Sequence, residues 1–101
     1  MADEIQADYD KLGQVASKFA NQAQATSDMT RKVRAAMQKL EQGGWMGRGA
    51  DSFFKEMNGV VLPALKRMET ALQTGSQVSK EISQKMRTAE DEACSPFKQP
   101  I

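Results

Sequence analysis

The sequence predicts an all-α fold, an antiparallel two-helix hairpin that dimerises into a four-helix bundle. Three observations favour this fold. Apolar residues recur at alternating steps of three and four in both halves of the chain, and glycines cluster in the middle. The apolar face of the second half is also wider than one hairpin requires. With 101 residues, the chain is expected to form a single helical-hairpin domain over residues 1–101.

The first helix is predicted over about residues 9–42. Its apolar and small residues form one stripe, which is typical of a helix that packs along its length on another helix. The stripe consists of Tyr9, Leu12, Ala16, Phe19, Ala23, Thr26, Thr30, Val33, Met37 and Leu40. Asp8 is a candidate N-cap, and Asp3 with Gln6 three residues later gives an alternative, earlier start.

A turn is predicted over residues 43–49, because the periodic pattern stops there and glycine after a periodic run ends a helix. The segment reads Gly-Gly-Trp-Met-Gly-Arg-Gly. A short connection of this kind favours antiparallel neighbouring helices. The turn therefore predicts a hairpin.

The second helix is predicted over about residues 50–94, followed by a flexible tail at 95–101, because Ser95-Pro96 disfavours helix. Its first apolar stripe is Ala50, Phe54, Met57, Val61, Ala64, Met68, Ala71, Gly75, Val78, Ile82 and Ala89, and a second is Phe53, Val60, Leu65, Leu72 and Met86. Pro63 predicts either a kink or a break near residues 59–62 that would give three helices. The residues expected in the core or the dimer interface are Phe19, Leu40, Phe53, Phe54, Met57, Val61, Leu65, Met68 and Leu72.

The distribution of charge favours a head-to-tail dimer. Residues 1–10 carry four acidic residues and no basic one, and residues 31–55 carry six basic and two acidic residues. In a hairpin the acidic segment lies far from the turn and the basic segment lies beside it. Two antiparallel hairpins would place opposite charges together, which would affect orientation more than affinity. We therefore expect an antiparallel homodimer, although a heterodimer with a related chain fits the same apolar stripes.

Composition argues against an enzyme and against a cofactor or metal site. Without histidine the chain has no Ser-His or Cys-His pair, and C-x-x-C, EF-hand and phosphate-loop motifs are absent. The net charge of +1 gives no basic face for nucleic acid, and no apolar run predicts stable membrane insertion. Cys94 is the single cysteine, and the acidic start MADEIQADYDKL does not read as a signal peptide.

The mid-chain motif Trp45-Met46-Gly47, set between two long amphipathic helices, resembles the WXG100 (ESAT-6-like) family of small bacterial proteins. The small residue and aromatic that follow, Ala50 and Phe53, are similar to that family's second-helix start. A C-terminal element of the family is matched in spacing by Met86, Glu90, Ala93 and Phe97. Many members have tyrosine at the first position, where this chain has Met86.

The resemblance implies a secreted protein that folds in the bacterial cytoplasm and is exported as a dimer by a type VII (ESX-like) system with an FtsK/SpoIIIE-like membrane ATPase. It would act there as an export partner, adaptor or effector. The resemblance also implies that the turn of one subunit lies near the C-terminal element of the other.

Several alternatives stay open at this point. The chain could be a cytosolic coiled-coil subunit of a larger assembly. It could also be a membrane-active hairpin, but such a hairpin needs a basic polar face and the polar face here is balanced in charge. One alternative is that Trp45 caps the core and does nothing else. The other is that Trp45 also forms half of a recognition surface. Gly47 fits a backbone requirement better than a contact. Glu90 could belong to a recognition element or to a solvated acidic run.

Overall fold

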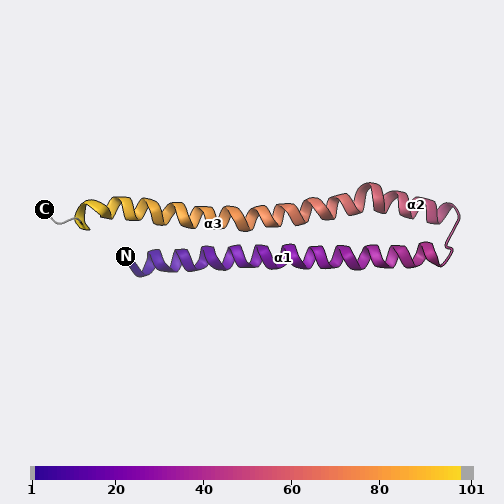
Figure 1. Ribbon diagram of the computed structural model, residues 1–101, viewed down its shortest axis with the longest axis horizontal. Coiled ribbons are helices and arrows are strands. Elements are labelled where there is room, and N and C mark those ends of the chain that lie inside the picture. The colour runs from indigo at the N-terminus through magenta and orange to yellow at the C-terminus, as the bar shows by residue number, and fades with distance from the viewer. Residues whose placement is uncertain (1, 99–101) are drawn as a thin grey trace.

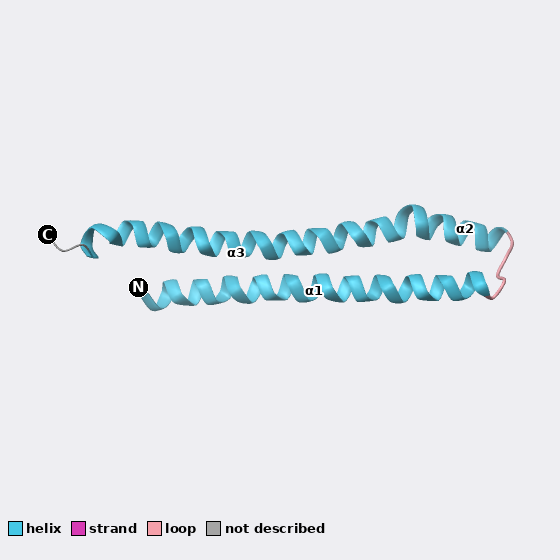
Figure 2. Ribbon diagram, viewed as in Figure 1, coloured by secondary structure: helices cyan, strands magenta, loops and turns pink. Residues whose placement is uncertain are grey.

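Two long antiparallel helices lie side by side along a narrow rod in the computed structural model, which describes residues 2–98 and the side chains of residues 6–93 (Figure 1). Helix α1 spans Ala2–Gln42, α2 spans Arg48–Glu56, a π-helical turn η1 spans Met57–Val61, and α3 spans Leu62–Lys98. The rod measures 81 × 19 × 17 Å. Helices and one loop account for all of residues 2–98, so the predicted all-α hairpin is confirmed (Figure 2).

Both helices are longer than expected. Helix α1 begins at Ala2 and not near residue 9, so neither Asp8 nor Asp3 caps it. The early residues include alanine and glutamine, which have a high helix propensity. They also include acidic residues, which complement the helix dipole in the first turns. Helix α3 continues through Ser95-Pro96 to Lys98 and does not end at residue 94. A proline this close to a helix end removes one hydrogen bond, and few turns follow it.

Pro63 does not break the second half of the hairpin into separate helices. The chain instead widens into the η1 turn just before it, where the Leu62 N–H donates to the carbonyl of Met57, five residues back. Proline has no N–H, and in a regular helix its ring would press on the carbonyl of Gly59. The wider turn accommodates this strain, at the cost of one extra residue in the helical path.

The extra residue decides which side of α3 faces α1. Buried and half-buried positions of α3 follow steps of three and four that start at Leu62, one position after Val61. We call them the inner stripe: Leu62, Leu65, Glu69, Leu72, Ser76, Ser79, Ser83 and Glu90. Beyond residue 61 most of the first predicted stripe is turned outward, although Gly75 is half-buried beside the Phe19 ring. We call five of its exposed members the outer stripe: Ala64, Met68, Ala71, Val78 and Ile82. The inward side of α3 beyond residue 61 instead includes Leu65 and Leu72 of the second predicted stripe.

The positions predicted in α1 are largely those that face α3. Five of them are buried, and these are Tyr9, Ala16, Ala23, Thr26 and Met37. Leu40 is exposed, as is Met68 of α3, so neither belongs to the core of the single hairpin. The other residues expected in the core or the dimer interface are half-buried: Phe19, Phe53, Phe54, Met57, Val61, Leu65 and Leu72.

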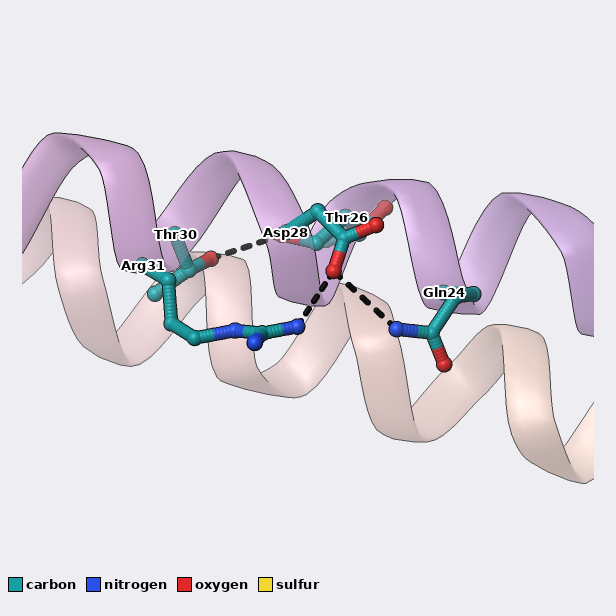
Figure 3. A network of polar contacts seen from close by, with 5 residues as sticks. All are labelled: Gln24, Thr26, Asp28, Thr30 and Arg31. Carbon is teal, nitrogen blue, oxygen red and sulfur yellow. Dashed lines mark hydrogen bonds and ion pairs between the residues drawn. The ribbon is translucent and has the colours of Figure 1, made fainter.

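Small and polar residues dominate the contact between the helices. Three hydroxyls bond back to the carbonyl one turn earlier: Thr26 to Gln22 at 2.8 Å, Thr30 to Thr26 at 2.9 Å and Ser79 to Gly75 at 2.8 Å. Such bonds satisfy buried hydroxyls within their own helix. Figure 3 shows the Thr30 bond beside the surface carboxylate of Asp28, which accepts from Gln24 and pairs with Arg31. The polar stripe is thus tolerated, but it contributes little hydrophobic stabilisation.

The rod exposes much more surface than a compact protein of its mass. Its accessible area is 7916 Å², whereas a chain of 11.1 kDa is expected to expose about 5,700 Å². No large side chain among the described residues is completely buried. The hairpin therefore leaves apolar surface that a second molecule can cover.

Candidate functional site

The turn between α1 and α2 depends on the backbone conformations of two glycines, Gly44 and Gly47. Helix α1 ends in a Schellman motif: the Trp45 N–H donates to the Leu40 carbonyl at 3.2 Å, and the Gly44 N–H donates to the Glu41 carbonyl at 3.1 Å. Gly44 has the positive φ of 79° that this motif needs. These bonds satisfy carbonyls that a helix end leaves free, and they set the direction in which the chain leaves α1.

Gly47 is the N-cap of α2, and its backbone conformation is one that glycine alone adopts readily. Its φ is 111° and its ψ is −176°. A side chain at this φ and ψ is strained, although no other atom lies within 4 Å of where its Cβ would be. The Gly47 carbonyl accepts the first hydrogen bond of the helix from the Asp51 N–H at 3.0 Å. The glycine of the W-x-G motif is therefore required by the backbone.

Three aromatic rings form a cluster at this end of the rod. The Trp45 ring lies 5.3 Å from Phe53 and 5.6 Å from Phe54, and the two phenylalanine rings are 5.3 Å apart, all in tilted or edge-to-face arrangements. Such pairs hold their rings in preferred geometries. Trp45 nevertheless keeps 41 % of its surface exposed, and the neighbouring Met46 keeps 82 %. The cluster stabilises the turn and also presents an apolar surface to solvent.

A second constellation lies at the other end of the rod, where α1 begins and α3 ends (Figure 1). The buried Tyr9 hydroxyl donates to Glu90 Oε2 at 2.6 Å, and the Arg87 guanidinium lies 4.7 Å above the Tyr9 ring. The hydrogen bond to Glu90, burial and the Glu90 charge raise the pKa of Tyr9 from 10.0 to about 12. Glu90 is therefore held against α1 and is not simply one member of a solvated acidic run.

The raised pKa of Tyr9 predicts a loss of stability at high pH. The phenol of the unfolded chain ionises near pH 10, while the folded chain keeps its proton until about pH 12. The stabilisation is complete below pH 10, and it decreases as the pH rises toward 12. In thermal unfolding followed by circular dichroism, Tyr9→Phe should lack this loss of stability between pH 10 and pH 12. Equal slopes for the two proteins would contradict the prediction.

Comparison with known proteins identifies the chain. The family model described as "WXG100: Proteins of 100 residues with WXG" matches residues 4–91. The chain belongs to the WXG100 family. No curated protein matches it. No solved structure matches it either.

In this WXG100 chain the two predicted motif regions lie at opposite ends of the rod. Trp45 and Gly47 belong to the turn, and Met86, Glu90 and Ala93 lie near the far end of α3 (Figure 1). Met86 and Ala93 are exposed, and the side chain of Phe97 lies outside the described residues, as does that of Cys94. One molecule therefore cannot bring both regions together, and their joint role in export stays a prediction.

The pairing of Tyr9 with Glu90 was missed by the sequence analysis, which placed Tyr9 in the core stripe and Glu90 in a separate motif. The signal that could have found it is the antiparallel pairing of positions along the hairpin. That pairing depends on the extra residue in η1, because the straight period places Ala89 on the inner side. The WXG100 motifs alone carry no such information.

The described residues contain neither a membrane-spanning helix nor a metal-binding cluster. None of the helices combines the length and the apolar character needed to cross a membrane. Within the same part of the chain, no group of three or more His, Cys, Asp or Glu residues could hold a metal ion.

Proposed function

We propose that this WXG100 protein is a non-enzymatic substrate of a type VII secretion system, exported as a folded dimer and acting as an export partner, adaptor or effector. The observation that carries the proposal is the family match over residues 4–91, which includes the glycine-built Trp45-Met46-Gly47 turn. A cytosolic coiled-coil subunit is the alternative. The turn supports the first reading because it leaves an aromatic cluster partly exposed at one end of the rod.

Surface area supports the dimer. The rod exposes about 2,200 Å² more than expected for a compact chain of its mass. A typical stable interface buries roughly 800 Å² from each partner. A second copy, or a related family member, can therefore pack along the rod and bury less than the extra exposed area. Dimers of this kind are also the usual arrangement for helical hairpins that form bundles.

Charge supports an antiparallel arrangement of the two copies. The acidic residues at positions 1–10 lie at the end of the rod opposite the turn, while the basic segment at 31–55 surrounds the turn. Head-to-tail packing places opposite charges together at both ends of the dimer. Each exposed pair contributes only about 0–1 kcal/mol, so the effect is on orientation.

A spin-label measurement tests this arrangement. We expect a Met46→Cys variant, with Cys94→Ser to remove the native thiol, to give labels at opposite ends of a dimer as long as the 81 Å rod. Double electron–electron resonance should then show no short distance between labels. A short distance would mean that the two turns lie together, and it would overturn the antiparallel arrangement. Light scattering on the same sample distinguishes a dimer from a monomer.

Export is tested in the bacterium that encodes the chain. We expect the protein in the culture medium when the FtsK/SpoIIIE-like membrane ATPase is intact, and only in cells when the ATPase gene is deleted. A cytosolic enzyme measured in the same fractions controls for lysis. Retention in the cells of both strains would support the cytosolic alternative, and equal release from both would exclude dependence on the ATPase.

A further inference from the structure

The η1 turn controls which residues of α3 are available to another molecule. Up to Met57 the inward positions follow the simple period, but after η1 every inward position lies one residue later than that period predicts. The polar residues Ser76, Ser79 and Glu90 consequently face α1, and the apolar residues Val78 and Ile82 face outward. If the same residues formed a regular α-helix without the wide turn, α3 would be rotated by about 100° and this order would be reversed.

We propose that η1 acts as a register device which keeps the outer stripe turned outward, where it forms the surface onto which a second copy of the chain packs. This inference rests on the dimer proposed above and adds which residues form its interface. A helix straightened through Pro63 would bury the outer stripe within its own hairpin. The same sequence would then retain little apolar surface for a partner.

The two flanks of α3 differ sharply in chemistry. The outer stripe runs along one flank, and each of its members directly precedes a residue of the inner stripe. The other flank is polar, and it includes Lys66, Gln73, Gln77, Lys80 and Gln84. Exposed apolar residues that recur at helical spacing on one side are typical of a surface that packs against another helix. Only one of the flanks of α3 therefore suits an apolar contact.

Helix α1 adds apolar residues to the same face. Val15 and Met29 are exposed, and each directly precedes a residue of α1 that faces α3, Ala16 and Thr30 respectively. Antiparallel helices are related by a rotation about an axis perpendicular to the plane that contains them. Residues one position before the contact on either helix therefore lie on the same face of the hairpin. Helix α1 also places Lys11, Lys18 and Lys32 at such positions, so the outer stripe of α3 is the more apolar half of this face.

A second copy is the partner that fits this face. The apolar face runs along the rod, and the rod carries opposite charges at its two ends, so an antiparallel copy matches it in length, chemistry and charge. The polar residues of the inner stripe do not compete for the partner, since no buried side-chain nitrogen or oxygen in the described part of the chain lacks a hydrogen bond. The buried polar groups of each hairpin are thus satisfied within the hairpin, whereas apolar side chains stay exposed to solvent.

The interface is tested by adding charge to each flank in turn. We expect the double variant Val78→Glu, Ile82→Glu to weaken dimerisation by at least 100-fold while the helical content of the monomer is kept, because both side chains are exposed in the hairpin. The matched control Gln73→Glu, Gln84→Glu adds the same charge to the polar flank of the same helix. Sedimentation equilibrium gives the dissociation constants. Dimerisation weakened equally by both pairs, or by neither, would overturn the proposed interface.

The register is tested by changing the chain length by one residue on either side of Pro63. Deletion of Asn58 combined with Pro63→Ala removes both the extra residue of η1 and the ring that the wider turn accommodates, so a regular helix can form and every later side chain keeps its orientation. Insertion of one alanine after Lys85, in a regular part of α3, rotates Glu90 away from Tyr9 and brings Ala89 into its place. Tyr9 is the only tyrosine, so its absorbance titration reports the register. We expect its ionisation to stay near pH 12 in the combined deletion variant and to fall toward pH 10 in the insertion variant.

The outcomes separate this inference from the proposed function. If deletion of Asn58 combined with Pro63→Ala shifts the Tyr9 titration toward pH 10, α3 follows the uninterrupted period and the register device is wrong, whatever the oligomeric state. If the wild-type chain is monomeric by light scattering, the proposed self-association fails while the Tyr9 result stands. Support requires both an unshifted titration and a dimer that is lost only with charge on the outer stripe.

Discussion

Replacement of Leu62 by alanine should lower the free energy of unfolding by about 2–4 kcal/mol. Leu62 is only 3 % exposed, and it is the first residue after η1 that packs against α1. Leu65 and Leu72 are the only other large apolar residues of the inner stripe, so few apolar contacts remain between the helices when Leu62 is truncated. Urea unfolding followed by circular dichroism measures the change at a fixed chain concentration, since unfolding of a dimer depends on concentration.

Val60→Ala is the control for Leu62→Ala. Val60 lies two residues earlier, within η1, and is 52 % exposed, so its truncation should cost less than about 1 kcal/mol. A larger loss of unfolding free energy for Val60→Ala than for Leu62→Ala would mean that Val60, and not Leu62, faces α1. The pair of variants therefore checks the register as well as the packing.

Gly47→Ala is expected to lower the free energy of unfolding by about 2 kcal/mol. The cost is in the backbone, because a φ of 111° with a ψ of −176° lies where residues with a Cβ are strained. No atom would clash with the added methyl group, so steric crowding is not the cause. For a domain of this size, the thermal midpoint should fall by roughly 8–16 °C.

Gly49→Ala provides a matched control two residues away. Gly49 lies inside α2, has no positive φ and has open space around its Cβ position. Alanine there should leave stability unchanged or raise it by about 0.5–1 kcal/mol, since alanine favours helix. Equal losses from the two substitutions would show that the turn does not depend on the special conformation of Gly47.

Much of this hairpin could be predicted from local features. Steps of three and four identify both helices, and the glycines at 43–49 identify the turn, because these signals depend on residues close together in the sequence. The inward side of α1 was also predicted, since no irregular turn interrupts that helix. The helix ends were not, because the cost of a proline or the gain from a cap is small near a terminus.

The register of α3 could not be predicted in the same way. Pro63 signals a disturbance, but a kink, a break and a π-helical turn all relieve the same strain. Both stripes of α3 have helical spacing, so spacing alone does not choose between Met68 and Glu69, or between Ala89 and Glu90, as the residue that faces α1. The hydrogen bond between Tyr9 and Glu90 depends on that choice.

The sequence by itself determined that the chain is helical, that it folds back at Trp45-Met46-Gly47, and that it carries more apolar surface than one hairpin buries. Only the tertiary structure decided which apolar residues stay outside. The physical reason is that a helix repeats every 3.6 residues, so one inserted residue turns all later side chains by about 100° without changing their local preferences. The sequence pattern is the same before and after such a rotation, and packing against α1 alone distinguishes the two.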